Sequence, residues 1–266
     1  AGDGDLELAA LRERVTARPY ELKSRLRLAA AYEMQGAPEL AADHYRIALD
    51  HHPESQEAAE RLADALARSG QRESAISVLA SFADRKADVP APFLSRLAIR
   101  LDEAGMADRG EMYHRRAIEM APQQDALRNN LGYNFLMRKH YDEAVHEFRA
   151  ALVLNSKSAT ARNNLAWALA NRGGADDVQE AVLQWQSLAG PAAARSNLAA
   201  VLIEQGKYVA AREQLGIASG HDARHPAVLR NLQVVAELDG KRAEVAVEAP
   251  AGGTETSGSD VASFIG

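Results

Sequence analysis

A leucine recurs about every 34 residues along this chain, and that period constrains the fold more than any other feature. Successive leucines are spaced by 34, 35, 34, 34, 33 and 34 residues: Leu28, Leu62, Leu97, Leu131, Leu165, Leu198 and Leu232. A small residue lies thirteen positions after five of them, at Ala41, Ala75, Gly110, Ala144 and Ala211. Between the leucine and the small residue, a glycine recurs eight positions after the leucine, at Gly36, Gly70, Gly105, Gly173 and Gly206. Small residues in register let helices approach closely, so the period predicts helix pairs that stack on one another.

The composition excludes several classes of function. The chain has 266 residues and no cysteine, which removes disulfides, thiolate nucleophiles and cysteine zinc sites. Its net charge of −6 at pH 7 argues against a general nucleic-acid-binding protein. No run approaches the roughly 18 apolar residues of a membrane span, so we expect no transmembrane segment.

The N-terminus leaves the compartment open. The chain begins with Ala1, as it would after loss of an initiator methionine, cleavage of a signal peptide or trimming. A removed signal sequence would place the protein in the periplasm or on the envelope, and otherwise we expect it in the cytoplasm.

The fourth repeat shows the recurring pattern most completely. Its positions are filled by Leu131, Gly132, Phe135, Ala144, Phe148 and Ala151, with Ser156 at the closing position. This order resembles the tetratricopeptide repeat (TPR) family, in which proline closes a unit of about 34 residues made of two antiparallel helices. The resemblance implies an all-α fold, a right-handed α-solenoid of stacked antiparallel helix pairs.

The same register divides the chain into segments. Apolar spacing in residues 5–18 predicts a leading helix, and the proline that begins residues 226–239 predicts a capping helix. Residues past Lys241 are rich in Gly, Ser, Thr and Pro without a lasting period, which predicts disorder. We expect a leading helix in 1–21, six repeats (22–55, 56–90, 91–124, 125–158, 159–191 and 192–225), a cap in 226–240 and a disordered tail in 241–266.

The fifth repeat departs from the others. The distance from Leu165 to Ala181 is 16 residues where the other repeats have 13, and from Ala181 to Leu198 it is 17 where 21 is usual. We expect a lengthened turn over residues 173–177 and a shortened second helix.

The first helix of each repeat presents a polar face. With the recurring leucine numbered as position 7, positions 2, 5, 6, 9, 12 and 13 point away from the buried side. In TPR proteins this face lines the concave groove where peptides bind, and the resemblance implies the same here. The residues expected there for peptide binding are Asn129, Asn130, Tyr133, Met137, Asn163, Asn164, Trp167, Asn171, Asn197 and Asn231, and possible anion contacts are Arg27, Arg61 and Arg96.

A column of asparagines suits an extended peptide. Each amide carries donors and an acceptor, so it can pair with backbone C=O and N–H without demanding a sequence, while aromatic side chains select the partner. The arrangement resembles the asparagine ladder of some TPR proteins. Two alternatives stay open: the asparagines are ordinary solvated residues, or Trp167 packs against the next repeat.

We therefore predict a non-enzymatic scaffold for a protein or peptide partner, with no cofactor. No phosphate-binding or nucleophile-elbow motif occurs in the sequence. Glu111-x-x-His114 and Glu143-x-x-His146 lie on second helices at different repeat positions, so we expect no metal. The alternative is a structural adaptor or oligomerising module that uses its convex surface or ends.

The later repeats suggest a setting. The segments ARNNLAWALANRG and ARSNLAAVLIEQGKYVAAREQL resemble bacterial TPR proteins, some of which are envelope lipoproteins in pilus assembly of the tight-adherence type. The resemblance implies an envelope, pilus or secretion assembly. Neither the partner nor the oligomeric state follows from it.

Overall fold

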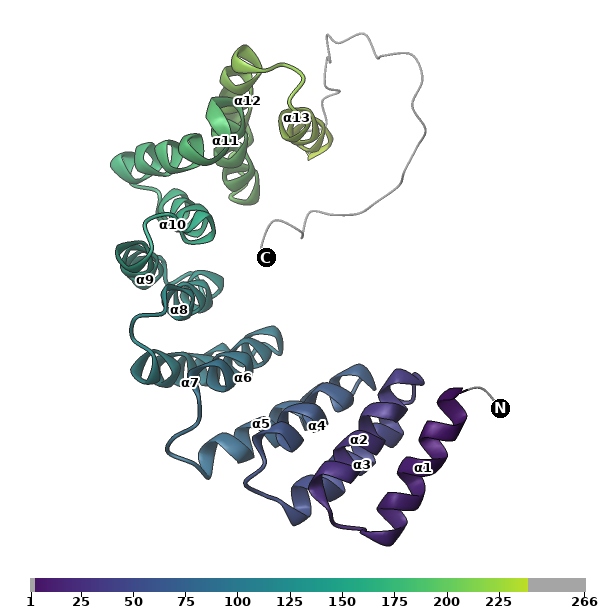
Figure 1. Cartoon of the computed structure of the whole chain (residues 1–266). Helices are drawn as coiled ribbons and strands as arrows, with labels where there is room; N and C mark the ends of the chain where they lie inside the picture. Colours follow the sequence, from purple (N-terminus) through teal and green to yellow (C-terminus); the bar gives the residue numbers. More distant parts are fainter. Residues whose placement is uncertain (1–2, 239–266) are drawn as a thin grey trace. The chain divides into compact units, whose positions relative to one another are not determined.

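The computed structural model describes residues 3–238, which form thirteen α-helices and no strand (Figure 1). The predicted all-α architecture is therefore confirmed, while the predicted disordered tail lies outside the described residues. The helices are α1 (Asp3–Ala17), α2 (Leu22–Met34), α3 (Pro38–His51), α4 (Gln56–Arg68), α5 (Arg72–Asp84), α6 (Ala91–Glu103), α7 (Ala107–Met120), α8 (Asp125–Met137), α9 (Tyr141–Leu154), α10 (Ala159–Arg172), α11 (Ala175–Glu204), α12 (Tyr208–His221) and α13 (Pro226–Leu238). None of these helices is long and apolar enough to cross a membrane.

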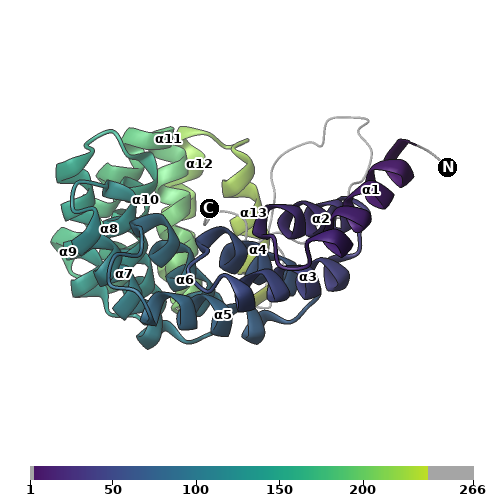
Figure 2. The same cartoon turned by 60° about the horizontal axis from the view of Figure 1, so that its bottom comes forward.

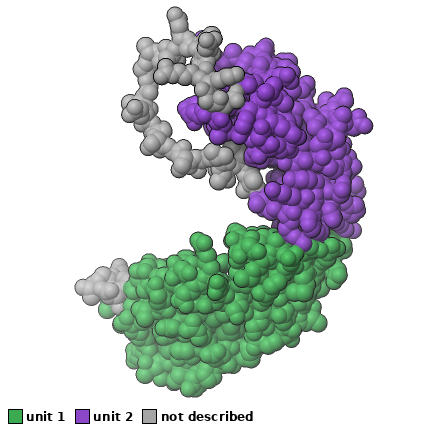
Figure 3. Space-filling model, turned by 180° about the vertical axis from the view of Figure 1, so that it is seen from behind, with its two compact units in different colours: residues 1–122 green, residues 123–266 purple. Residues whose placement is uncertain are grey.

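The chain divides into two compact units, 1–122 and 123–266 (Figure 3). Unit 1 holds α1 to α7, in which each helix packs against the next one along the chain (Figure 1, Figure 2). The recurring leucines of α2, α4 and α6 are at most 2% exposed, and the small residues Ala41 and Ala75 are equally buried. Each such leucine stabilises the fold by about 1.5–3 kcal/mol, which explains why the period marks the core.

A second buried position follows on the second helices. Four residues after each small residue, a larger side chain fills the space between the two helices of a pair. These side chains are at most 1% exposed: Tyr45, Leu79, His114, Phe148, Trp185 and Leu215. The fit is close, because a Cβ atom on Gly132 would lie 2.7 Å from Cε1 of Phe148.

His114 is the polar member of this set. Its Nε2 donates to Oδ2 of Asp102 at 2.9 Å, although the histidine is only 1% exposed. Gly110 stands where other repeats carry alanine, and a Cβ atom there would overlap Oδ1 of Asp102. The three residues thus depend on one another: the glycine leaves room for the carboxylate, and the carboxylate accepts from the buried Nε2 of the histidine.

Unit 2 holds α8 to α13, again with consecutive helices in contact. The first helices also pack directly, α8 against α10 and α11 against α13. The last helix closes the stack, because Val228 and Val235 join the buried cluster of Ala199 and Leu215.

The fifth repeat differs from its prediction. Helix α10 ends at Arg172 and α11 begins at Ala175, so the turn consists of Gly173 and Gly174 alone. The second helix runs from Ala175 to residue 189 before a kink, so the predicted shortening of this helix is wrong, and so is the predicted lengthening of the turn over residues 173–177. The spacing from Ala181 to Leu198 is short because the connection to the next repeat is short: Gly190 alone joins two helical segments.

Gly190 makes this short connection possible. Its φ of 84° and ψ of 175° lie in a region that is essentially restricted to glycine. We predict that Gly190→Ala lowers the free energy of unfolding by about 1–3 kcal/mol through backbone strain. A Cβ atom there would meet nothing within 4 Å, so steric contact contributes nothing.

Urea denaturation followed by circular dichroism measures this effect. Gly216→Ala is the matched control, because that glycine lies inside α12 with nothing within 4 Å of its Cβ position. The control is expected to leave stability unchanged or raise it by up to about 1 kcal/mol. Equal midpoints for the two variants would contradict the role of the Gly190 backbone.

Candidate functional site: an asparagine face and a cationic pocket

Polar residues join the first helices of neighbouring repeats. Nδ2 of Asn164 donates to Oδ1 of Asn129 at 3.1 Å, between α10 and α8. Nδ2 of Asn231 donates to the backbone oxygen and Oγ of Ser196, both at 3.0 Å, between α13 and α11. In each case position 6 of one repeat bonds position 5 of the repeat before it.

These bonds change how the asparagine column is understood. Asn164 is only 7% exposed, so its amide serves mainly the packing of α8 against α10. Asn129 is half-buried and uses its oxygen in that bond, which leaves its Nδ2 hydrogens as donors with a fixed orientation. The helix contact thus fixes the orientation of the amide of Asn129.

Two tryptophans pack against each other in this part of unit 2, and Trp167 is the one that reaches the surface. Trp185 is 1% exposed, and its Nε1 donates to Oδ1 of Asn163 at 2.9 Å. Trp167 is half-buried and meets Trp185 edge to face, with ring centroids 5.8 Å apart and planes at 83°. Trp167 is therefore not buried between repeats, and the indole beneath it fixes its ring.

Sequence reasoning missed Trp185. A signal was present, because Trp185 follows Ala181 by four residues, as Phe148 follows Ala144. The displaced register of the fifth repeat hid that correspondence.

The remaining predicted residues differ in how far their polar groups are used. Asn197 is half-buried and makes no side-chain hydrogen bond within residues 3–238; the oxygen of Asn163, which stands at position 5 of the preceding repeat, already accepts from Trp185. Nδ2 of Asn171 donates to the backbone oxygen of Trp167 at 2.9 Å. Met137 is 58% exposed.

We define the asparagine face as the partly exposed residues of α8, α10 and the second part of α11. Asn130 and Tyr133 are half-buried on α8, alongside Asn129. The members of this face are Asn129, Asn130, Tyr133, Met137, Asn163, Trp167, Asn171 and Asn197. Together they offer amide donors and acceptors and the two aromatic rings of Tyr133 and Trp167.

The three arginines predicted as anion contacts have different surroundings. Nη1 of Arg96 lies 3.4 Å from Oε2 of Glu60, an ion pair that links position 6 of α6 to position 5 of α4. Arg27 and Arg61 are exposed and make no hydrogen bond or ion pair within the described part of the chain. They line a hollow of about 480 Å³ between α2, α3 and α4, which we call the cationic pocket; its lining is Leu22, Lys23, Leu26, Arg27, Ala30, Tyr45, Glu57 and Arg61.

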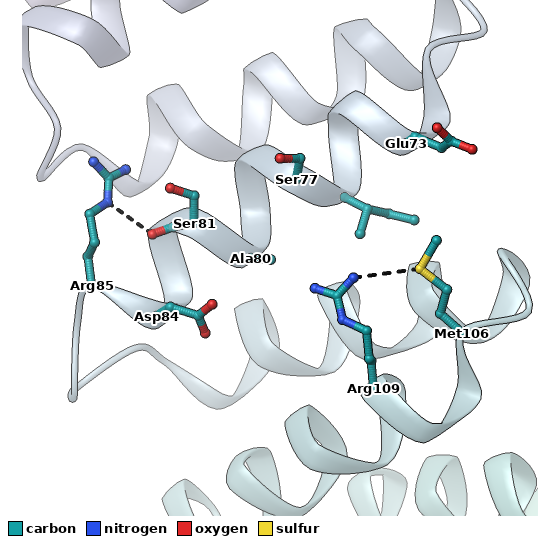
Figure 4. A pocket seen from close by; sticks show the side chains of 9 residues that line it. Glu73, Ser77, Ala80, Ser81, Asp84, Arg85, Met106 and Arg109 are labelled. Atoms are coloured by element: carbon teal, nitrogen blue, oxygen red, sulfur yellow. Dashed lines mark hydrogen bonds between the residues drawn. The ribbon is translucent and has the colours of Figure 1, made fainter.

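A second hollow in unit 1 lies along α5 and the start of α7 (Figure 4). Its charged residues balance, because Glu73 and Asp84 oppose Arg85 and Arg109. Nε of Arg85 donates to the backbone oxygen of Ser81 at 2.9 Å, as Figure 4 shows. The charged side chains of this hollow therefore sum to no net charge.

Histidine and carboxylate side chains form no metal site in residues 3–238, where no group of three or more is placed to hold an ion. His114 of the first candidate motif bonds Asp102, and His146 of the second is exposed beside Glu147.

No protein-family model matches the chain, and no curated protein matches it. Several solved structures do. YrrB, a TPR protein described as having an unusual peptide-binding site, is 15% identical with a TM-score of 0.53 over 83% of this chain and 96% of its own. A TPR protein from Parabacteroides merdae is 14% identical with a TM-score of 0.64, over 83% of this chain and 87% of its own.

A further likeness is to the C-terminal part of a TPR repeat-containing protein from Cytophaga hutchinsonii. It is 14% identical with a TM-score of 0.64, over 86% of this chain and 95% of that one. At these identities the likeness concerns the fold, and it confirms the predicted α-solenoid of stacked helix pairs. The chain has the fold of a tetratricopeptide-repeat protein.

Proposed function

We propose that this protein is a non-enzymatic interaction scaffold and that the asparagine face of unit 2 binds an extended peptide segment of a partner. One observation carries the proposal: partly exposed amides lie on the same helices as the partly exposed ring of Trp167 and on the helices next to it, and hydrogen bonds within unit 2 hold several of them in place. Asn129 is held by Asn164 at 3.1 Å and Asn163 by Trp185 at 2.9 Å. Amides that are already oriented lose little conformational entropy on binding.

The chemistry of this face fits peptide backbone. Asn163 keeps its Nδ2 donors, because its oxygen accepts from Trp185, and Asn197 keeps both donors and acceptor. An extended peptide offers one N–H and one C=O per residue and advances about 3.3–3.6 Å per residue. Packed helix axes lie about 8–10 Å apart, so each first helix would meet about three peptide residues.

Trp167 supplies the affinity that amides lack. A hydrogen bond exchanged with water contributes only about 0.5–1.5 kcal/mol, whereas a large aromatic side chain at the centre of an interface can contribute more than 2 kcal/mol. We therefore infer a partner segment with a large apolar side chain that packs on this ring. The flanking residues are held through their backbone, so their side chains can vary.

A displayed library of random peptides, selected on the whole chain, tests the proposal. The affinities of the selected peptides are then measured for Trp167→Ala and Asn197→Ala by fluorescence anisotropy. We expect each variant to weaken binding about tenfold or more, which corresponds to about 1.4 kcal/mol. Asn197→Ala breaks no hydrogen bond to a described residue, so its effect is not a loss of fold.

Val153→Ala on α9 is the control, because this side chain is 84% exposed on a second helix. The control should bind as the unchanged protein does. Selected peptides that respond to Val153 and ignore Trp167 would contradict the proposal and favour an adaptor that uses the other face.

For the setting, we propose an envelope, pilus or secretion assembly of a bacterium. The support is the resemblance of segments 161–173 and 194–215 to bacterial TPR proteins. The peptide-binding site attributed to YrrB, which shares the fold, supports the class of ligand.

A further inference from the structure

Unit 1 contains cations that no neighbouring group neutralises. Lys23, Arg27 and Arg61 are exposed around the cationic pocket and make no hydrogen bond or ion pair within residues 3–238. Some other arginines of this unit are paired with carboxylates, as Arg46 is with Asp43 and Arg68 with Glu33. The three free cations face one carboxylate on the pocket, Glu57, in a chain whose net charge is −6.

The repeat geometry explains why Arg61 is free. At three other junctions a polar residue at position 5 pairs with the position-6 side chain of the next repeat: Glu60 with Arg96, Asn129 with Asn164 and Ser196 with Asn231. The position-5 residue that precedes Arg61 is Leu26, which has no acceptor. The leucine therefore removes the partner of Arg61 and adds apolar surface beside it.

The pocket also has an apolar floor. Leu22, Leu26 and Ala30 line it from α2, and Tyr45 lines it from α3. The Tyr45 hydroxyl donates to Oε2 of Glu33 at 3.0 Å, and burial together with this bond raises the pKa of that hydroxyl, so the phenol stays neutral. A space of about 480 Å³ with apolar and cationic walls is in the size range of ligand pockets.

We propose that the cationic pocket binds an acidic segment of a partner protein in which a glutamate or aspartate stands beside a large apolar side chain. The apolar side chain fills the space over Leu22, Leu26 and Tyr45, and the carboxylates lie against Arg27 and Arg61. Guanidinium groups pair with carboxylates through two parallel hydrogen bonds, which gives this contact its direction.

This site is separate from the asparagine face. It lies in unit 1, it selects acidic residues where the asparagine face selects backbone, and it does not rest on the proposed function. A broad polyanion surface is a poorer fit, because Glu57 and the buried floor interrupt the cations and the chain as a whole is negative.

Three short synthetic peptides, added to the whole chain and followed by fluorescence anisotropy, test the proposal. The first alternates glutamate with leucine, the second alternates glutamine with leucine, and the third alternates glutamate with alanine. We expect binding of the first alone, because the second lacks carboxylates and the third lacks apolar side chains. Raising sodium chloride from about 0.1 M to about 1 M shortens the Debye length from about 10 Å to about 3 Å and should weaken binding.

The variants follow from the pairing of the arginines. Arg27→Gln combined with Arg61→Gln should weaken binding of the first peptide about tenfold or more. Arg96→Gln is the matched control, since it changes the same repeat position where Glu60 already neutralises the charge. Leu26→Glu should also abolish binding, because it gives Arg61 the partner that Glu60 gives Arg96.

Several results would overturn the proposal. Equal loss in Arg96→Gln and the double variant would show a general charge effect, and unchanged binding in the double variant would exclude the pocket. Tight binding of phosphatidylserine vesicles without binding of the first peptide would assign the cations to a lipid surface instead. Variants of Trp167 should leave this binding unchanged, so failure here and failure of the asparagine face are distinguishable.

Discussion

Trp185→Ala is expected to lower the free energy of unfolding of unit 2 by about 3–5 kcal/mol. Trp185 is the largest fully buried side chain and packs between α11 and α10. Its removal leaves a large cavity, deprives Oδ1 of Asn163 of its donor and removes the ring against which Trp167 rests. The cavity and the loss of the donor to Asn163 both lower the free energy of unfolding.

Urea denaturation of the whole chain measures this loss, and hydrogen exchange shows where it falls. Stacked repeats can unfold in parts, so exchange should be faster in α10 to α12 than in unit 1. Leu183→Ala, 57% exposed on the same helix, should change stability by less than about 0.5 kcal/mol. A loss below about 1 kcal/mol for Trp185→Ala would contradict the tight packing between these helices.

The same variant reports on the asparagine face. Trp167 becomes the only tryptophan of the chain, so its fluorescence can be followed by itself. We expect its emission to shift to longer wavelength, because the indole that orders it is gone. Peptides selected on the unchanged protein should bind Trp185→Ala more weakly even where it stays folded.

Gly110→Ala is expected to have the next largest effect, a loss of about 3 kcal/mol that combines overpacking of about 1–3 kcal/mol with a broken charged hydrogen bond. The new methyl group would overlap Oδ1 of Asp102 and lie 3.2 Å from the backbone oxygen of Ala98. The carboxylate must move, and the buried Nε2 of His114 then loses its acceptor. The Nδ1 atom of the same ring already has no partner among the described residues, so the imidazole would have none.

A cycle of variants separates this mechanism from ordinary crowding. Gly110→Ala should cost much less when combined with Asp102→Ala and His114→Leu, because the combination recreates the apolar packing of the other repeats. Replacing a buried polar pair by well-packed apolar residues is often neutral or stabilising. If the three effects simply add in urea denaturation, the residues are not coupled as described.

Most of the fold could be predicted because its signal is periodic. Leu28, Leu62 and Leu97 recur with small residues at fixed distances, and each of these positions is buried. The fifth repeat broke the prediction where that period shifts. Two arrangements give the same total spacing: a lengthened turn with a shortened second helix, and a short turn with a one-residue connection to the next repeat. The φ of Gly190 distinguishes them, and the only sign of it in the sequence is a glycine before Pro191.

The candidate sites were less predictable, because the state of a polar side chain depends on residues about 35 positions away. Asn164 and Asn197 occupy the same repeat position, yet one bonds Asn129 and the other makes no side-chain hydrogen bond within residues 3–238. At the corresponding place in the repeat before Asn197, the oxygen of Asn163 accepts from Trp185 instead. Arg61 and Arg96 differ for a similar reason, since Leu26 precedes one and Glu60 the other.

The sequence by itself determined the helical fold class and the recurring core positions, because leucines and small residues at a fixed period are buried together. Only the tertiary structure decided which amides, arginines and indoles keep groups free for a partner. Hydrogen bonds and ion pairs form between specific atoms across neighbouring repeats, and their distances follow from the stacking of the helices rather than from the period.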